Sequence, residues 1–126
     1  MTSIIEKILA SPEGGTVKLG GGDLPAAGYF VGGVVSPLVI EPGDDQADVR
    51  DNLKFFLGYL TEDTAALRSV QFVGWWTDEE TGKVWVDGTS WHESEAEAMS
   101  ASVGRSEIAF WDIAGQREIR TVGKEV

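Results

Sequence analysis

Residues 70–86 have the sequence Val-Gln-Phe-Val-Gly-Trp-Trp-Thr-Asp-Glu-Glu-Thr-Gly-Lys-Val-Trp-Val. The two arms, 70–76 and 83–86, are aromatic and β-branched, which is typical of strands. The polar segment between them contains Gly82, which can adopt the positive φ that a tight hairpin turn requires. This stretch therefore predicts a β-hairpin and antiparallel strand pairing.

The clearest predicted helix precedes this hairpin, at residues 44–60. Its first turns are rich in aspartate, which the helix dipole favours at that end. Phe55 and Tyr59 form an additional aromatic pair, which we expect to widen the buried face. The main apolar stripe follows the helical period and consists of Val49, Leu53, Phe56, Leu57 and Leu60.

Two shorter helices are predicted at residues 1–12 and 94–103. Each begins with a capping-box spacing, in which a serine and the glutamate three residues later can satisfy each other's free amides. These pairs are Ser3 with Glu6 and Ser94 with Glu97. The apolar face of the second helix is predicted to contain Ala96, Met99 and Val103.

Further strands are predicted at residues 16–19, 29–40, 107–113 and 117–122. Gly32-Gly33 and Pro37 interrupt the second of these segments, which favours two strands or one strongly bent strand, with a bulge or a close backbone approach at the glycines. A turn is expected at 61–69 and a frayed tail at 123–126. Together these elements predict a single α+β domain over residues 1–126, with a mixed or mainly antiparallel sheet and about three helices packed on it.

The composition excludes several classes of site. The chain of 126 residues has no cysteine, so disulfides, thiolate metal sites and cysteine nucleophiles cannot form. His92 is the single histidine, so a multi-histidine metal centre cannot form within one chain. No apolar run approaches the roughly 20 residues that span a membrane, and residues 1–15 do not resemble a signal peptide. We expect a cytoplasmic protein.

The net charge is −11, and the acidity is spread over both halves of the chain. Residues 1–63 carry 4 basic and 10 acidic side chains, and residues 64–126 carry 6 and 11. This charge disfavours direct binding to nucleic acid or to anionic lipid. It fits a surface tuned for solubility, a surface that attracts a basic protein, or a DNA mimic.

The five tryptophans all lie between positions 75 and 111. Trp75 and Trp76 are adjacent on a predicted strand, so their side chains point to opposite faces. At most one of them can enter a core that is covered by helices, and the other needs a ligand, a partner, a loop or water. The predicted binding site therefore combines tryptophans and carboxylates of the hairpin: Trp75, Trp76, Trp85, Asp78, Glu79 and Glu80.

Three other segments invite a chemical interpretation. Gly20-Gly21-Gly22 resembles a phosphate cradle, but no phosphate-binding motif follows it, which favours a flexible turn. The segment 87–93 contains Asp87, Ser90 and His92, the residue types of a hydrolase, although turn and helix-cap roles explain them as well. Residues 78–80 lack the calcium-loop pattern. We expect no metal and no cofactor.

The run Val-Gly-Trp-Trp-Thr-Asp-Glu-Glu-Thr-Gly-Lys-Val-Trp-Val-Asp at 73–87, the acidic helix after it and Glu-Ile-Ala-Phe-Trp-Asp-Ile at 107–113 resemble small acidic proteins of actinobacteria and their phages. The resemblance covers roughly residues 55–120. It implies a cytoplasmic, phage or mobile-element protein that binds a host protein. It brings no catalytic residues with it.

These observations lead us to expect a non-enzymatic interaction module that docks a protein partner, or a second copy of itself, through the tryptophan hairpin and nearby carboxylates. One alternative is a DNA mimic that inhibits a nucleic-acid-binding protein. Another is a small hydrolase or transferase centred on His92, with Asp87 and Ser90.

Overall fold

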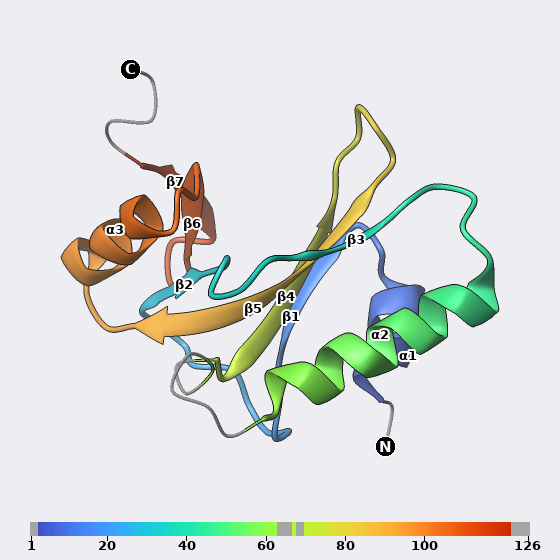
Figure 1. Ribbon diagram of the computed structural model, residues 1–126. Coiled ribbons are helices and arrows are strands. Elements are labelled where there is room, and N and C mark those ends of the chain that lie inside the picture. The colour runs from blue at the N-terminus through green and yellow to red at the C-terminus, as the bar shows by residue number, and fades with distance from the viewer. Residues whose placement is uncertain (1–2, 63–66, 68–69, 122–126) are drawn as a thin grey trace.

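A seven-stranded sheet forms the centre of the computed structural model, which describes residues 3–62, 67 and 70–121 (Figure 1). All of its strand pairs are antiparallel, and the strand order is β1-β4-β5-β2-β6-β7, with β3 also paired to β5. The strands are β1 (Gly14–Lys18), β2 (Tyr29–Val31), β3 (Leu38–Ile40), β4 (Phe72–Thr77), β5 (Val84–His92), β6 (Ala109–Asp112) and β7 (Arg117–Arg120).

Strand β5 organises the sheet because it is long enough to pair with three other strands. Its residues 84–89 pair with β4 along one edge. Along the other edge, residues 84–86 pair with β3 and residues 90–92 pair with β2. The predicted hairpin at 70–86 is therefore confirmed, and the predicted 29–40 segment forms two strands that flank the same neighbour.

The helices are α1 (Ile4–Ala10), α2 (Gln46–Leu60) and α3 (Glu95–Gly104). Helix α1 contacts β1, α2 contacts β3, and α3 contacts β2, β5 and β6. Val86 belongs to the core beneath α1 and α2, and a Cβ at Gly88 would touch Leu60 of α2. Further along the same face, Ser90 accepts a hydrogen bond from Arg105 at the end of α3. Because successive residues of a strand alternate in direction, the opposite face of β5 is left without a helix. The predicted α+β fold is confirmed.

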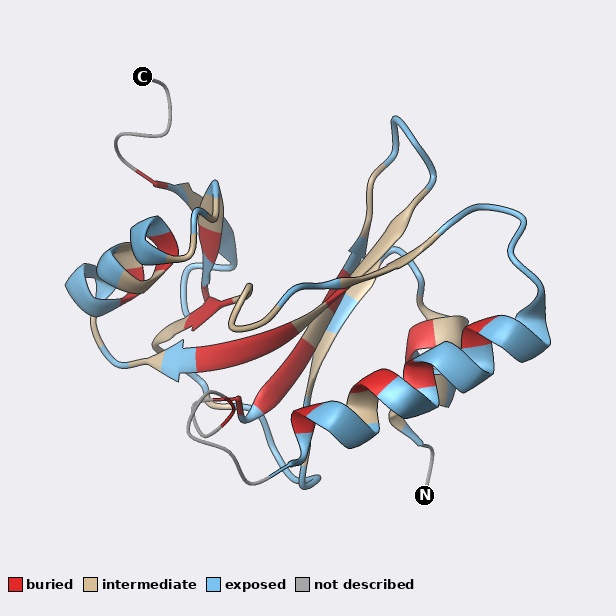
Figure 2. Cartoon of the chain, viewed as in Figure 1, coloured by how far each residue is buried: buried red, intermediate tan, exposed pale blue. Residues whose placement is uncertain are grey.

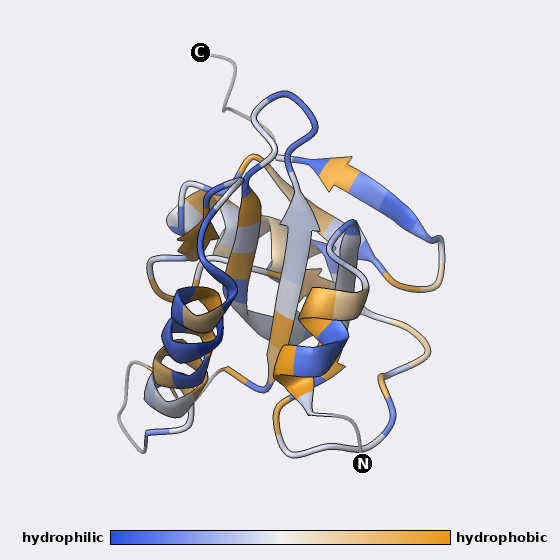
Figure 3. Ribbon diagram, turned by 90° about the vertical axis from the view of Figure 1, so that its right-hand side faces the viewer, coloured by the Kyte–Doolittle hydropathy of each residue, from blue (hydrophilic) through white to orange (hydrophobic). Residues whose placement is uncertain are grey.

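The main core lies between helices α1 and α2 on one side and strands β1, β3, β4 and β5 on the other. In Figure 2 the buried positions of α2 follow one side of the helix, and Figure 3 shows apolar and polar residues alternating along α1 and α2. Such alternation is what amphipathic helices on a sheet require. The buried members of this core are Ile8, Val49, Leu53, Phe56, Leu60, Leu67, Val70, Val73, Trp75 and Val86.

The serine half of each predicted capping box is confirmed. Ser3 Oγ accepts from the Glu6 amide at 3.1 Å, and Ser94 Oγ accepts from the Glu97 amide at 3.2 Å. The Glu6 carboxylate, however, forms an ion pair with Arg50 of α2. The glutamate therefore ties α1 to α2, because a cation on the neighbouring helix competes with the cap for the same carboxylate.

Two expectations about helix faces are wrong. Phe55 is 81% exposed and Tyr59 is 40% exposed, because α2 rests on the sheet along the narrower stripe of Val49, Leu53 and Phe56. On α3, Met99 packs against the core as predicted, but Ala96 and Val103 are exposed, and the fully buried residues are Ala98 and Ser102. Small side chains bring that helix close to the sheet, where Ala98 packs with Val31 and Phe110.

The predicted tail at 123–126 and most of the predicted turn at 61–69 lie outside the described residues. Within the described part of the chain, no helix combines the length and the apolar character needed to cross a membrane.

Candidate functional site

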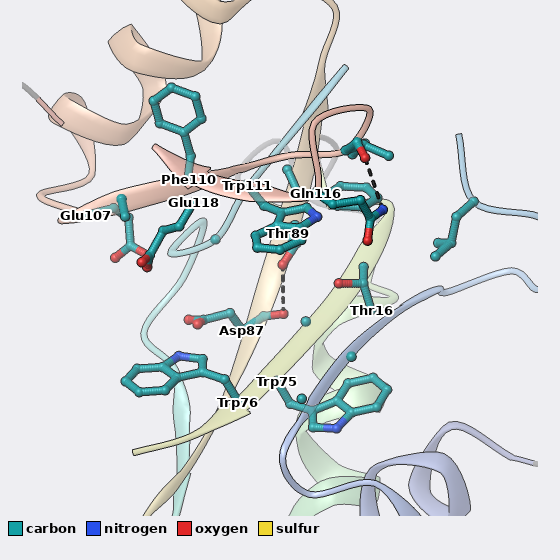
Figure 4. A pocket seen from close by; sticks show the side chains of 18 of the residues that line it. Thr16, Trp75, Trp76, Asp87, Thr89, Glu107, Phe110, Trp111, Gln116 and Glu118 are labelled. Carbon is teal, nitrogen blue, oxygen red and sulfur yellow. Dashed lines mark hydrogen bonds between the residues drawn. The ribbon is translucent and has the colours of Figure 1, made fainter. Parts of the chain in front are cut away.

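An open cleft of about 900 Å³ lies on the face of the sheet that the helices leave uncovered. Figure 4 shows it from close by, with Trp76 and Trp111 on either side of Asp87. Its walls come from segments far apart in the chain, including β1, β4, β5, β6 and β7. The charged residues among its lining are Glu13, Asp87, Glu107 and Glu118, and this lining contains no lysine or arginine.

The tryptophan pair is divided between the two faces of β4, as the alternation of strand side chains predicts. Trp75 is 5% exposed and lies in the core, where its Nε1–H donates to the Ser11 carbonyl oxygen at 2.7 Å. Trp76 is 49% exposed on the cleft side. Of the two, Trp76 is the residue that a partner can reach.

Trp85 supports Trp76 from the neighbouring strand. The two residues are register partners, and their rings stack with centroids 6.3 Å apart and planes 12° apart. Trp85 is half-buried, and its Nε1–H is buried without a hydrogen-bond partner among the described residues. The stack holds the exposed indole of Trp76 in a fixed orientation at one end of the cleft.

The three carboxylates predicted with the tryptophans do not line the cleft. Asp78 stabilises the hairpin turn, since its Oδ1 accepts from the Glu80 amide at 3.0 Å and its carbonyl accepts from the Gly82 amide at 2.7 Å. Glu79 and Glu80 are exposed at the tip of the hairpin. The carboxylates that accompany Trp76 are instead Asp87 and its neighbours in the cleft.

The pKa of the Asp87 carboxyl group is raised in this site. Burial raises its pKa to about 6, the negative charge of Glu107 adds to the rise, and a hydrogen bond from the Gly33 amide opposes it. Among the described residues, no ion pair involves Asp87. A half-buried carboxylate that has no ion-pair partner among the described residues and lies in a cleft marks a candidate functional site.

The Gly32-Gly33 pair passes directly beside these carboxylates. A Cβ at Gly32 would lie 3.3 Å from the Asp87 side chain, and one at Gly33 would lie 2.8 Å from the Glu107 carboxyl group. Gly33 also has a φ of +74°, in the left-handed region that disfavours residues with a side chain. The predicted close approach at these glycines is confirmed. The absence of side chains at 32 and 33 leaves room for the side chains of Asp87 and Glu107.

The pair Gly33→Ala and Gly58→Ala tests this geometry. Gly33→Ala should lower the free energy of unfolding by about 1–3 kcal/mol, because the left-handed backbone disfavours a residue with a Cβ and the Glu107 carboxyl group would have to move away. Gly58 lies in α2 with open space around it, so alanine there should raise the same quantity by roughly 0.5–1 kcal/mol. Urea unfolding measures both, and equal effects of the two substitutions would contradict the left-handed backbone and close approach at Gly33.

Of the hydrolase residues predicted at 87–93, the structure brings Ser90 and His92 together but places Asp87 elsewhere. Ser90 Oγ and His92 Nε2 lie 2.8 Å apart, and Arg105 donates to the same hydroxyl at 2.9 Å. Asp87 points to the cleft on the other face of β5, and Ser90 is only 2% exposed. Burial and the positive charge of Arg105 lower the pKa of His92. The serine and histidine therefore join β5 to α3, and Asp87 belongs to a different site.

The remaining candidates have open or structural surroundings. Gly20, Gly21 and Gly22 form an exposed turn, with nothing within 4 Å of an added Cβ. In the part of the chain that the structure describes, no group of three or more histidine or acidic side chains is placed to hold a metal ion.

Sequence reasoning missed Asp87 as a cleft residue and missed Glu107, Trp111 and Glu118 altogether. The Gly32-Gly33 pair predicted a close approach at the right position, but it did not indicate which residues would make that approach. Comparison of the chain with protein-family models, with characterised proteins and with solved structures finds no match.

Proposed function

We propose that this protein is a non-enzymatic interaction module that binds a basic segment of a partner protein in its acidic, tryptophan-lined cleft. One observation carries the proposal: exposed Trp76 and Trp111 share an open cleft with four carboxylates and with no basic side chain in the lining. Exposed tryptophan is common at the centre of protein interfaces. The matching partner surface is positively charged.

The charge of the whole chain supports the same kind of partner. A net charge of −11 attracts a basic protein from a distance and repels nucleic acid and anionic lipid. The resemblance to small proteins of actinobacteria and their phages supports a setting in the cytoplasm of an actinobacterial host. In that setting the protein is a phage or mobile-element accessory protein that binds a host protein.

Substitution of Trp76 tests the proposal, with Phe55 as a matched control. Phe55 is also an exposed aromatic residue, but it lies on α2, away from the cleft. Tagged wild type, Trp76→Ala and Phe55→Ala are incubated with actinobacterial lysate, with and without nuclease, and the retained protein is identified and purified. Calorimetry should show that Trp76→Ala weakens the purified complex by on the order of 30-fold, as at an interface hot spot, whereas Phe55→Ala leaves the affinity unchanged.

Equal binding by wild type and Trp76→Ala would place the interface elsewhere, and loss of binding in Phe55→Ala would move it to α2. Capture of no protein from the lysate counts against the proposal. Binding that weakens steeply with salt and is competed by duplex DNA would instead support the DNA mimic. The circular dichroism of both variants should match the wild type, because both side chains are on the surface.

A further inference from the structure

We infer that the group received by the cleft is an arginine side chain of the partner, stacked on the indole of Trp76 and paired with the carboxylate of Asp87. This inference rests on the proposed function, because it names the chemistry that the same cleft recognises.

The Asp87 carboxylate is the negative charge that would pair with the guanidinium group of the arginine. Its side chain lies between Trp76 and Trp111 in Figure 4 and has no ion-pair partner among the described residues. Asp87 lines the cleft and is only half-buried. Its register partner on β4 is Gly74, which places no side chain beside it, and the nearest group to a Cβ at that position would be the Thr89 hydroxyl at 3.2 Å. A long side chain that enters the cleft can therefore reach Asp87.

The aromatic walls distinguish a guanidinium from an ammonium group. Arginine is weakly hydrated and planar, and it stacks on tryptophan more often than lysine does. Its parallel N–H groups also match the two oxygens of a carboxylate. A strongly hydrated ammonium gains less from a half-buried carboxylate between indole rings. The cleft of about 900 Å³ also leaves room for the residues on either side of the arginine.

The same geometry makes binding depend on pH. The charged groups that line the cleft with Asp87 are Glu107, Glu13 and Glu118, all of which are acidic. Arg105 is the nearby cation: its side chain donates to the Gly32 carbonyl oxygen at 3.2 Å, and the charge of Glu107 opposes the lowering of its pKa by burial. His92 contacts Ser90 on the other face of β5. The pKa of Asp87 is about 6, so the carboxyl group is mostly neutral at pH 5 and mostly ionised at pH 7.5. Affinity for an arginine should therefore fall as the pH is lowered through about 6.

The test uses three blocked nine-residue peptides of glycine and serine that carry arginine, lysine or citrulline at three alternate positions. Citrulline has the shape of arginine without its charge. Binding to the full chain is measured by tryptophan fluorescence and calorimetry at pH 7.5 and pH 5. We expect the arginine peptide to bind more tightly than the lysine peptide, and the citrulline peptide to bind least.

Two variants that each remove one negative charge test whether the affinity and its pH dependence arise from Asp87. Asp87→Asn should weaken the arginine peptide by about 30-fold, in line with the loss of one member of a partly buried charge pair, and should abolish the pH dependence. Glu80→Gln removes the same formal charge at the hairpin tip and should leave affinity and pH dependence unchanged. Trp76→Ala should weaken binding several-fold through loss of the cation–π contact.

Equal affinity for the arginine and citrulline peptides would overturn the inference, and so would equal effects of Asp87→Asn and Glu80→Gln. A lysine peptide that binds as well as the arginine peptide would exclude the guanidinium preference. Absence of arginine-peptide binding at millimolar concentration would also reject the inference. In each case the proposed function is judged separately, by whether Trp76→Ala weakens the complex with the captured protein.

Discussion

Replacing Trp75 with alanine is expected to lower the free energy of unfolding by about 3–5 kcal/mol, the usual range for removal of a large aromatic side chain from a core. Trp75 is 5% exposed and packs in the core formed beneath α1 and α2. Its removal also leaves the Ser11 carbonyl without the indole N–H that donates to it at 2.7 Å. Urea unfolding followed by circular dichroism measures the change.

The neighbouring residue provides the control for this substitution. Trp76 is half-exposed on the opposite face, and its removal gives up little more than the stack on Trp85. Trp76→Ala should therefore cost about 0.5–1.5 kcal/mol. The assignment of one indole to the core and one to the cleft would be wrong if the two alanine variants were equally destabilised, or if Trp76→Ala were the worse of the two.

Replacing Asp87 with asparagine is expected to stabilise the protein at pH 7 by up to about 3 kcal/mol. The folded state raises the pKa of this carboxyl from 3.8 to about 6, and each unit corresponds to about 1.4 kcal/mol. A group whose pKa is raised on folding contributes its full stability below the unfolded value and loses it as the pH rises through the folded value. The wild type should therefore lose stability relative to Asp87→Asn between about pH 4 and pH 7.

Unfolding of both proteins in urea at pH 4, 5, 6 and 7 tests the sign. Asp112→Asn is the contrasting control, because hydrogen bonds from the Gly115 amide and from Arg117 lower the pKa of Asp112. That carboxylate stabilises the fold above its unfolded pKa, and the contribution is lost as the pH falls through its lower folded pKa. Asp112→Asn should thus be destabilised at pH 7. An Asp87→Asn variant that is less stable than wild type at pH 7 would contradict the burial of this charge.

A carboxylate that lowers the free energy of unfolding at neutral pH is typical of a binding site. Function often requires groups that are unfavourable for stability, and their removal then stabilises the protein while activity is lost. Asp87→Asn separates the two properties in one variant. A gain in stability together with a loss of partner binding would show that the binding defect does not arise from unfolding.

The local elements of this fold could be predicted because each depends on residues close together in the chain. The strand alternation of 70–86 gave the hairpin, the apolar period gave α2, and the serines at 3 and 94 gave two helix starts. Such local signals do not reveal how much of a helix surface the rest of the protein covers. Phe55 is exposed because only a narrow stripe of α2 rests on the sheet. The period of apolar residues along the helix gives no information on how wide that stripe is.

Composition and local alternation are enough to indicate an acidic α+β protein without disulfides, in which one of two adjacent tryptophans must leave the core. That Trp76 is this residue, and that Asp87, Glu107 and Trp111 line one cleft with it, follows from how the strands are ordered in the folded chain. Their meeting depends on the pairing of β5 with β2 and of β2 with β6. Strand order of this kind is fixed by the packing of the whole chain, because many pairings satisfy the same local alternation of side chains.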